Sequence, residues 1–199
     1  MAKNMQPIAK RCRTLGISPA AMGYSKKTSN RNPNANARRK KGEYSLQLNE
    51  KQKVKFVYGI MEKQFRMYYE KAEKATGKTG EVLLTTIERR LDNVVFRLGF
   101  AKTRREARQL VNHGHFLVNG KRVNIPSYLI KLGDVIAVSE KSRSTTRFKD
   151  MASSDEFITC PKWLEKSKNE LSGKVIAMPQ REDIDLPVEE TLIVELYSK

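Results

Sequence analysis

Cysteines and long apolar runs are scarce in this sequence, and each shortage argues against a class of protein. Cys12 and Cys160 are the only cysteines and form no C-x-x-C pair, so a structural zinc site built from cysteine has no support. No apolar run approaches the roughly 20 residues of a membrane-spanning helix, and the N-terminus lacks the apolar stretch of a signal peptide. We therefore expect a cytosolic protein with two free thiols and no membrane association.

Residue patterns for catalysis are equally few. His113 and His115 are the only histidines, and no cysteine or carboxylate lies at metal-ligand spacing from them. The sequence has no P-loop and no G-x-G-x-x-G motif. We interpret the acidic residues of 181–190 as a solvated or protein-facing run rather than a catalytic pair. These patterns predict a protein that is not an enzyme and holds no metal or cofactor.

Acidic residues are missing from the first 42 positions, and the whole chain is strongly basic. Lys and Arg number 39 against 22 Asp and Glu, which gives a net charge of +17. The net charge is +11 over 1–42, +10 over 43–150 and −4 over 151–199. Such an excess favours a polyanionic partner, most often nucleic acid, over a generic basic protein with a solvated surface. The acidic last quarter is expected to fold back on the protein or to meet another protein.

Hydrophobic spacing predicts that helices dominate the first half of the chain. Residues 1–45 are poor in large apolar groups, so we expect an irregular segment that either orders on a polyanion or serves as a solubilising tail. Helical pieces are expected from about residue 48 and over 61–75, where the aromatic side chains form a core face. A third helix begins near Thr79, breaks near Asp92, and ends at Gly99.

The stretch TRREARQLVNHGHFLVNGKRV, residues 103–123, combines a helix with a hairpin. Thr103 and Glu106 have the spacing of a capping box, so a helix begins there and closes at His113 and Gly114. FLVNGKRV then reads as a strand, a type I′ Asn-Gly turn and a return strand. VIAV at 135–138 predicts a further strand, and 139–153 a loop or short helix. Residues 188–197 fit a helix, although their β-branched cluster would also suit a strand; Pro187, which suits the first turn of a helix, favours the helix.

The helix that begins at Thr103 presents a row of basic and amide side chains opposite its apolar face. Arg104 and Arg108 are four residues apart, which places them on one face, and Lys121 and Arg122 of the hairpin come near the helix end. Arginine suits phosphate because its planar fork can bind two oxygens. These could be ordinary surface charges, but only Glu106 offsets them locally, and no Glu–Arg ladder neutralises the face. We therefore interpret this surface as a phosphate-binding site.

Residues 90–138, RLDNVVFRLGFAKTRREARQLVNHGHFLVNGKRVNIPSYLIKLGDVIAV, closely resemble the S-four type RNA-binding domain. The flanking segments LNEKQKVKFVYGIMEKQFRMYYEKA, 48–72, and LIVELYSK, 192–199, resemble the bacterial ribosomal protein S-four family of the small subunit. That resemblance implies an α+β fold. It consists of a basic extension over 1–45, a helical domain over 46–89 with about 186–199, and an inserted RNA-binding domain over 90–185 with its core at 90–152.

The resemblance also implies partners. Members bind 16S ribosomal RNA directly in its 5′ domain, nucleate the body of the small subunit, and contact ribosomal protein S-five. They affect decoding accuracy with S-five and S-twelve, and their basic N-terminal region lies near the messenger RNA entrance, where ARRKK at 37–41 would fall. Some members bind their own operon messenger, and the resemblance leaves that partner open for this chain. Many also carry a metal-binding cysteine cluster near the N-terminus, but this chain has only Cys12 there and resembles the cysteine-poor branch.

Two other classes of RNA-binding protein use the same module. An RNA-modifying enzyme such as a pseudouridine synthase would need a catalytic domain that the remaining residues cannot supply. A stand-alone rescue factor of the large subunit would lack the helical lobe and its characteristic ending. The residues expected to contact RNA are Arg38, Arg39, Lys40, Lys41, Lys51, Lys53, Lys55, Arg66, Arg90, Arg104, Arg105, Arg108, Gln109, Asn112, His113, Lys121 and Arg122.

Overall fold

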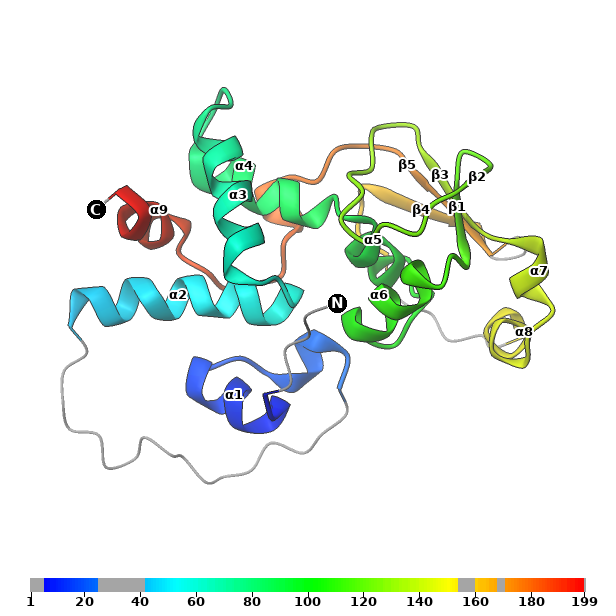
Figure 1. Cartoon of the computed structure of the whole chain (residues 1–199), viewed down its shortest axis with the longest axis horizontal. Coiled ribbons are helices and arrows are strands. Elements are labelled where there is room, and N and C mark those ends of the chain that lie inside the picture. Colours follow the sequence, from blue (N-terminus) through cyan, green and yellow to red (C-terminus); the bar gives the residue numbers. More distant parts are fainter. Residues whose placement is uncertain (1–5, 25–41, 154–159, 168–170, 199) are drawn as a thin grey trace. The chain divides into compact units, whose positions relative to one another are not determined.

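The computed structural model describes residues 6–24, 42–153, 160–167 and 171–198 of the chain (Figure 1). The chain divides into two compact units, one formed by Met1–Leu84 with Asp185–Lys199 and the other by Thr85–Ile184. The division falls within helix α4, Thr79–Glu88. The first unit therefore unites the beginning and the end of the chain, and the second unit is a continuous segment.

The N-terminal part of the first unit is folded, so the prediction of an irregular segment over 1–45 was wrong for the residues described there. Helix α1, Ile8–Leu15, ends at Gly16, which adopts a φ of 68°. A 3₁₀ turn, η1, follows over Pro19–Met22 and is capped by the Ser18 side chain. The buried side chains of this segment include Cys12, Leu15 and Met22. These few apolar side chains are enough to form a buried core for the segment, because α1 packs on both η1 and the helix that follows.

Four longer helices form the rest of the first unit: α2, Glu43–Tyr58; α3, Glu62–Glu73; the first part of α4; and α9, Glu190–Ser198. Helix α9 lies beside α2 (Figure 1). The aromatic face of α3 is core as predicted, because Phe65 and Tyr69 are buried. The Tyr197 ring of α9 stacks on Tyr69 with centroids 4.6 Å apart. The last segment of the chain is therefore a helix, and the choice of helix over strand is confirmed.

The second unit contains the short helices α5, Leu91–Arg97; α6, Arg104–Asn112; α7, Glu140–Arg143; and α8, Thr146–Ser153. Helix α5 starts one residue before Asp92, with Arg90 in extended conformation at its N-cap, so the predicted break was placed slightly late. Helix α6 begins after Thr103, whose hydroxyl accepts a hydrogen bond from the Glu106 amide, as the capping box predicts. The Glu106 carboxylate accepts from the Lys102 amide instead of the Thr103 amide.

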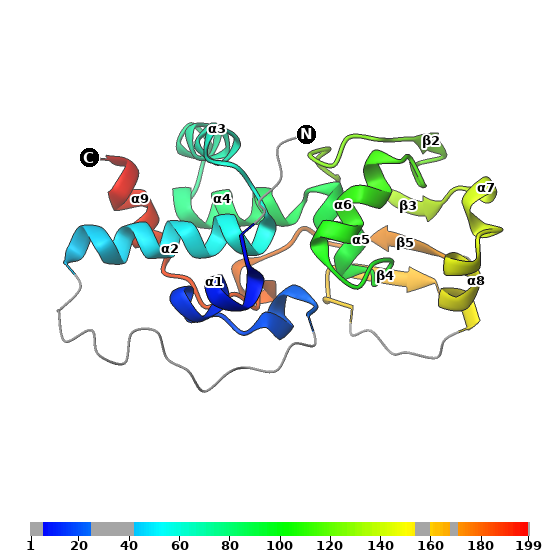
Figure 2. The ribbon, with the colours of Figure 1, turned by 60° about the horizontal axis from the view of Figure 1, so that its bottom comes forward.

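A five-stranded sheet completes the second unit, in the order β2-β1-β3-β5-β4. Figure 2 shows β3, β5 and β4 side by side in that order. The strands are β1, Phe116–Val118; β2, Lys121–Arg122; β3, Val135–Val138; β4, Leu164–Ser167; and β5, Ser172–Val175. All pairings are antiparallel, which confirms the α+β class. Asn119 and Gly120 have φ of 50° and 78°, the positive values that a type I′ turn requires. Strands β4 and β5 were not predicted, because LEKS and SGKV carry little of the alternation that marks a strand.

One hydrophobic core lies between this sheet and its helices. It joins the apolar sides of α5 and α6 to the inward residues of the strands, with Phe116, Ile136 and Trp163 among the most buried. Ala107, Leu110 and Val111 of α6 belong to it, as their spacing predicted. The buried side of α6 is thus fixed against the sheet, which sets the direction of its remaining side chains. Within the described ranges, no helix is long and apolar enough to cross a membrane.

Candidate nucleic-acid interface

The scaffold of the basic surface is an ion-pair network between α5 and α6. Asp92 of α5 is only 3% exposed. Its carboxylate accepts two hydrogen bonds from Arg90, at 3.1 and 2.8 Å, and one from Arg108 Nε of α6 at 2.7 Å. Charge-assisted bonds of this kind fix both distance and orientation. Asp92 therefore joins the two helices through a single buried carboxylate.

A second branch of the network starts at Glu88, which is 1% exposed and pairs with Arg97 at 2.9 Å. The Asn93 amide nitrogen donates to Glu88, and the Asn93 amide oxygen accepts from Arg104 Nε at 2.8 Å. The Arg104 guanidinium also lies over the Phe96 ring, 4.3 Å from its centroid. These contacts hold Arg104 at 8% exposure.

The sequence indicated Glu106 as the one local counter-charge of the arginine face of α6, but Asp92 of α5 is a further counter-charge, for Arg108. Arg104 and Arg108 point to Asn93 and Asp92, which lie 11 and 16 residues earlier in the chain. Arg90 is 3% exposed and bound to the same carboxylate. Helical spacing could not reveal these partners, because they come from another helix. Arg104 and Arg108 thus join α6 to α5, and Arg90 holds the Asp92 carboxylate to which Arg108 binds. The RNA contacts of these three arginines stay a prediction.

Other predicted contact residues of this region are directed to solvent. Arg105, Gln109, His113 and Lys121 are exposed, and Asn112 is half-buried. They come from the outer side of α6, from its C-terminal end and from strand β2 of the hairpin. The structure therefore brings a compact set of donors together on one part of the second unit.

Arg122 connects the hairpin to the helix. Its guanidinium donates to the backbone oxygens of Gly114 at 3.0 Å and His113 at 2.9 Å, at the C-terminal end of α6. Gly114 has a φ of 71°, and a Cβ on this residue would collide with the Arg122 side chain. Arg122 thus caps the helix and fixes the position of the neighbouring Lys121.

The predicted contact residues of the first unit lie in ion pairs. Lys51 and Lys55 both bind Glu62, the former at 2.9 Å. Burial raises the pKa of Glu62, but hydrogen bonds from both lysines and from Tyr197 outweigh it and lower the pKa to about 2. Lys53 pairs with Glu50 at 2.5 Å.

Arg66 of α3 pairs with Glu70 at 3.2 Å, where both side chains are more than half exposed. Such a pair is weak and can exchange its carboxylate for a phosphate at little cost. Arg38, Arg39, Lys40 and Lys41 lie outside the described residues.

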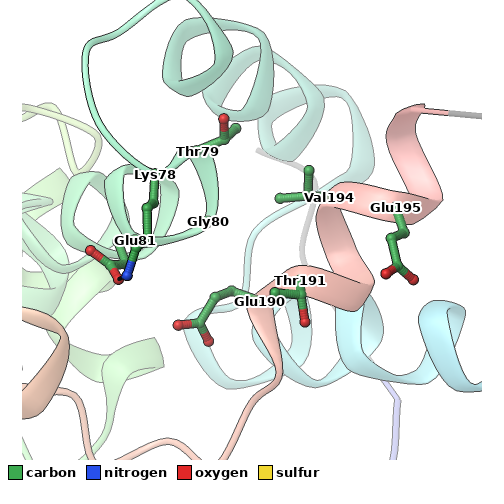
Figure 3. Close-up of a pocket in the computed structure, with 8 residues that line it drawn as sticks. All are labelled: Lys78, Thr79, Gly80, Glu81, Glu190, Thr191, Val194 and Glu195. Atoms are coloured by element: carbon green, nitrogen blue, oxygen red, sulfur yellow. Dashed lines mark hydrogen bonds and ion pairs between the residues drawn. The ribbon is translucent and has the colours of Figure 1, made fainter.

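Sequence reasoning missed an acidic pocket of about 450 Å³ in the first unit, where the N-terminal ends of α4 and α9 meet (Figure 3). Glu190 and Glu195 of α9 line it together with Glu81 and Lys78 of the α4 end, which pair with each other at 2.9 Å. Gly80 permits the approach, because a Cβ there would lie 2.7 Å from the Glu190 Cβ. The acidic composition of residues 181–190 was the only sequence signal for this surface.

The residues around Cys12 do not fit a metal site. The Cys12 side chain is fully buried, and its thiol lies 3.9 Å from the Met22 sulfur. Burial raises the pKa of the thiol, which disfavours the thiolate that would bind a metal. In the described ranges, no group of three or more His, Cys, Asp or Glu side chains is arranged to hold an ion. The absence of a metal stays a prediction.

Known proteins match this chain over its whole length. Residues 3–88 match the family described as "Ribosomal protein S4/S9 N-terminal domain", and residues 89–136 match the "S4 domain". Proteins named "Small ribosomal subunit protein uS4" are 56% identical in Lachnospira eligens and 54% in Agathobacter rectalis, each over 100% of both chains. The protein of that name in Clostridium tetani is 60% identical over 82% of this chain and 78% of its own. The chain therefore belongs to the uS4 family of small ribosomal subunit proteins, which are RNA-binding structural components of the bacterial ribosome in the cytoplasm and not enzymes.

Proposed function

We propose that this chain is a primary binder of 16S ribosomal RNA, which it contacts in the 5′ domain and thereby nucleates the body of the small subunit. The observation that carries this proposal is the exposed row of Arg105, Gln109, His113 and Lys121 on a scaffold held by a buried carboxylate. Because the scaffold fixes the backbone that carries these side chains, phosphate binding requires no backbone ordering in this surface. Residues 1–42 and 43–150, with net charges of +11 and +10, supply the surrounding positive potential.

Recognition is expected to depend on RNA shape. The α6–hairpin surface offers guanidinium, amide and ammonium donors and the imidazole of His113, but no exposed Phe, Tyr or Trp ring on α6 or the hairpin, among the residues described there. Such donors suit phosphates and 2′-hydroxyls at a junction of RNA helices better than stacked single bases. Binding would then constrain the angle between the RNA helices of the junction.

Filter binding to 16S 5′-domain RNA tests the proposal. Each phosphate contact contributes a slope of about −0.7 to −0.9 to the dependence of log affinity on log salt. The pair Arg105→Ala and Lys121→Ala is expected to weaken binding more than tenfold at 0.1 M salt and to reduce the slope by roughly 1.4 to 1.8. Lys162→Ala with Lys174→Ala is the matched control, since both lysines are exposed in the same unit. Wild-type affinity no better than that for random RNA would contradict the proposal.

The acidic pocket of the first unit supports a second contact, with ribosomal protein S-five. A surface with Glu190 and Glu195 on an otherwise basic chain favours a basic protein over RNA. Through this contact the chain would influence translational accuracy together with S-five and S-twelve. Glu190→Gln with Glu195→Gln should weaken binding to purified S-five, whereas Glu73→Gln, an exposed change elsewhere in the unit, should not. Equal affinities for the two variants would exclude the pocket as the contact.

Messenger RNA is the third proposed partner. The segment Arg38–Lys41, which lies outside the described residues, is densely basic and corresponds to the region that lies near the messenger entrance in the family it resembles. Crosslinking of a messenger analogue in assembled small subunits should label this segment. Labelling that survives replacement of all four residues by Gln would refute the assignment.

A further inference from the structure

Helices α7 and α8 are fixed against α6 and the residues that follow it. Arg147 of α8 pairs with Glu106 of α6 at 2.5 Å. Phe148 is 1% exposed and meets the Phe116 ring edge-on, with centroids 6.3 Å apart. Both a core contact and an ion pair therefore hold α8 in position.

Helix α7 is held through a histidine that follows the C-terminal end of α6. His115 Nδ1 lies 2.9 Å from the Ser142 hydroxyl. The His115 ring also lies 5.9 Å from Phe148, centroid to centroid. The segment 140–151 is thus part of the rigid surface that begins at α6.

The solvent side of this segment is basic. Lys141, Arg143 and Lys149 are exposed, and the acidic residues Glu140 and Asp150 offset only part of their charge. Glu106 of α6 is already engaged, since it accepts from the Lys102 amide as well as pairing with Arg147. The Nε of Arg147 is buried and has no hydrogen-bond partner in the part of the chain that the structure describes.

Cationic groups from three elements converge near His115. His113 at the end of α6 lies 6.0 Å from it, ring to ring. Burial lowers the pKa of His115, and the neighbouring His113, Arg122 and Arg147 side chains lower it further. Positive potential from α6, β2 and α8 is therefore concentrated at one place, next to α7.

We propose that α7 and α8 extend the RNA-binding surface beyond α6 and the hairpin, with Lys141, Arg143 and Lys149 contacting phosphates of the same RNA. The inference rests on the RNA binding proposed above and names a surface that sequence spacing did not suggest. Arg143 also donates from Nε to the Val138 backbone oxygen at 3.2 Å, which directs its guanidinium.

RNA suits this surface better than an acidic protein. The centre of a protein interface usually contains large apolar anchors. None of the exposed large apolar residues of the second unit lies on the described part of α7 or α8; they are Ile125, Tyr128, Leu132, Val135, Ile176 and Met178. Cations without apolar anchors are typical of contacts to a nucleic-acid backbone.

The double change Lys141→Gln with Lys149→Gln tests the inference, because it removes two exposed charges and no side-chain hydrogen bond known in the structure. Loss of two phosphate contacts should lower affinity for 16S 5′-domain RNA by roughly 25- to 60-fold at 0.1 M salt and reduce the salt slope by about 1.4 to 1.8. Lys162→Gln with Lys174→Gln makes the same change in charge on the β4–β5 side of the sheet and is expected to leave the slope close to that of the wild type.

The outcomes separate the inference from the function on which it rests. If the wild type binds the 5′-domain RNA tightly and the α7–α8 variant matches the control, the inference is wrong and the proposed function stands. If the wild type binds no better than it binds random RNA, the function itself fails. Unchanged RNA affinity with lost binding to an acidic protein would also overturn the inference. Fluorescence of Trp163, the single tryptophan, during urea unfolding shows whether each variant is folded.

Discussion

Replacement of Asp92 by Asn should destabilise the second unit strongly. The change keeps the size of the side chain and removes the charge that Arg90 and Arg108 share. Breaking a buried ion pair typically costs about 3–5 kcal/mol, because a buried charge is left without compensation. Arg108 has a 22% exposed side chain and can turn to water, whereas Arg90 at 3% cannot. We therefore expect a loss near the lower end, about 3 kcal/mol, most of it caused by Arg90.

Urea unfolding followed by Trp163 fluorescence measures this loss in the unit that contains Asp92, since Trp163 is 2% exposed in its core. A loss of about 3 kcal/mol lowers the melting temperature of a domain of this size by at least about 12 °C. Glu140→Gln, an exposed change in the same unit, is the control and should stay within about 0.5 kcal/mol of the wild type.

A rescue variant tests the cause of the loss. Adding Arg90→Met to Asp92→Asn removes the buried charge that has lost its partner, and it should recover much of the stability, because apolar replacements of buried pairs are often neutral. If Asp92→Asn cost no more than Glu140→Gln, the network would not hold α5 against α6. If the double variant lost as much stability as Asp92→Asn alone, the buried charge of Arg90 would not be the source of the loss.

Three further changes probe other parts of the fold. Gly114→Ala should lower the free energy of unfolding in urea by more than about 1 kcal/mol, because alanine is strained at positive φ and its Cβ would displace the Arg122 side chain. A loss of less than about 0.5 kcal/mol would refute the capping role of Arg122. Gly80→Val should destabilise the first unit by about 1–3 kcal/mol, measured by circular dichroism, since it forces α4 away from Glu190; an unchanged midpoint would contradict the close approach. The pKa of Glu62 is lowered to about 2 in the folded protein, so the ionised Glu62 stabilises the fold. This stabilisation is complete above the ordinary carboxylate pKa and is lost as the pH falls toward 2. Acid titration by circular dichroism should therefore show a shallower decline for Glu62→Gln than for the wild type, and identical curves would refute this.

Local chemistry made part of this fold predictable. Thr103 caps α6, Gly99 and Gly114 take positive φ, and Asn119 with Gly120 forms the turn that joins β1 to β2. Each of these features depends on a few adjacent residues, so the sequence alone carries the information. The C-terminal helix was predictable for the same reason, since its apolar spacing lies within one short segment.

Features that depend on distant partners were not predictable. Strand β5 pairs with β3 although about 35 residues separate them, and its own sequence, SGKV, has little strand character. Helix α1 needs η1 and α2 to bury its few apolar side chains. In both cases, tertiary contacts rather than local propensity determine the structure.

The arginines of α6 show how these two kinds of information combine at the candidate site. The sequence placed Arg104 and Arg105 together as phosphate ligands, but one residue of an α-helix turns the side chain by about 100°. That rotation directs Arg104 to Asn93 in the interior and Arg105 to solvent. Arg108 repeats the inward direction one turn later, and Gln109 the outward one. A single helix thus uses one row of polar side chains to hold its own position and leaves the adjacent row exposed, where we propose that it binds RNA. The buried row sets the orientation of the helix, so the rigidity of the proposed RNA-binding surface depends on the ion pairs and hydrogen bonds of Arg104 and Arg108.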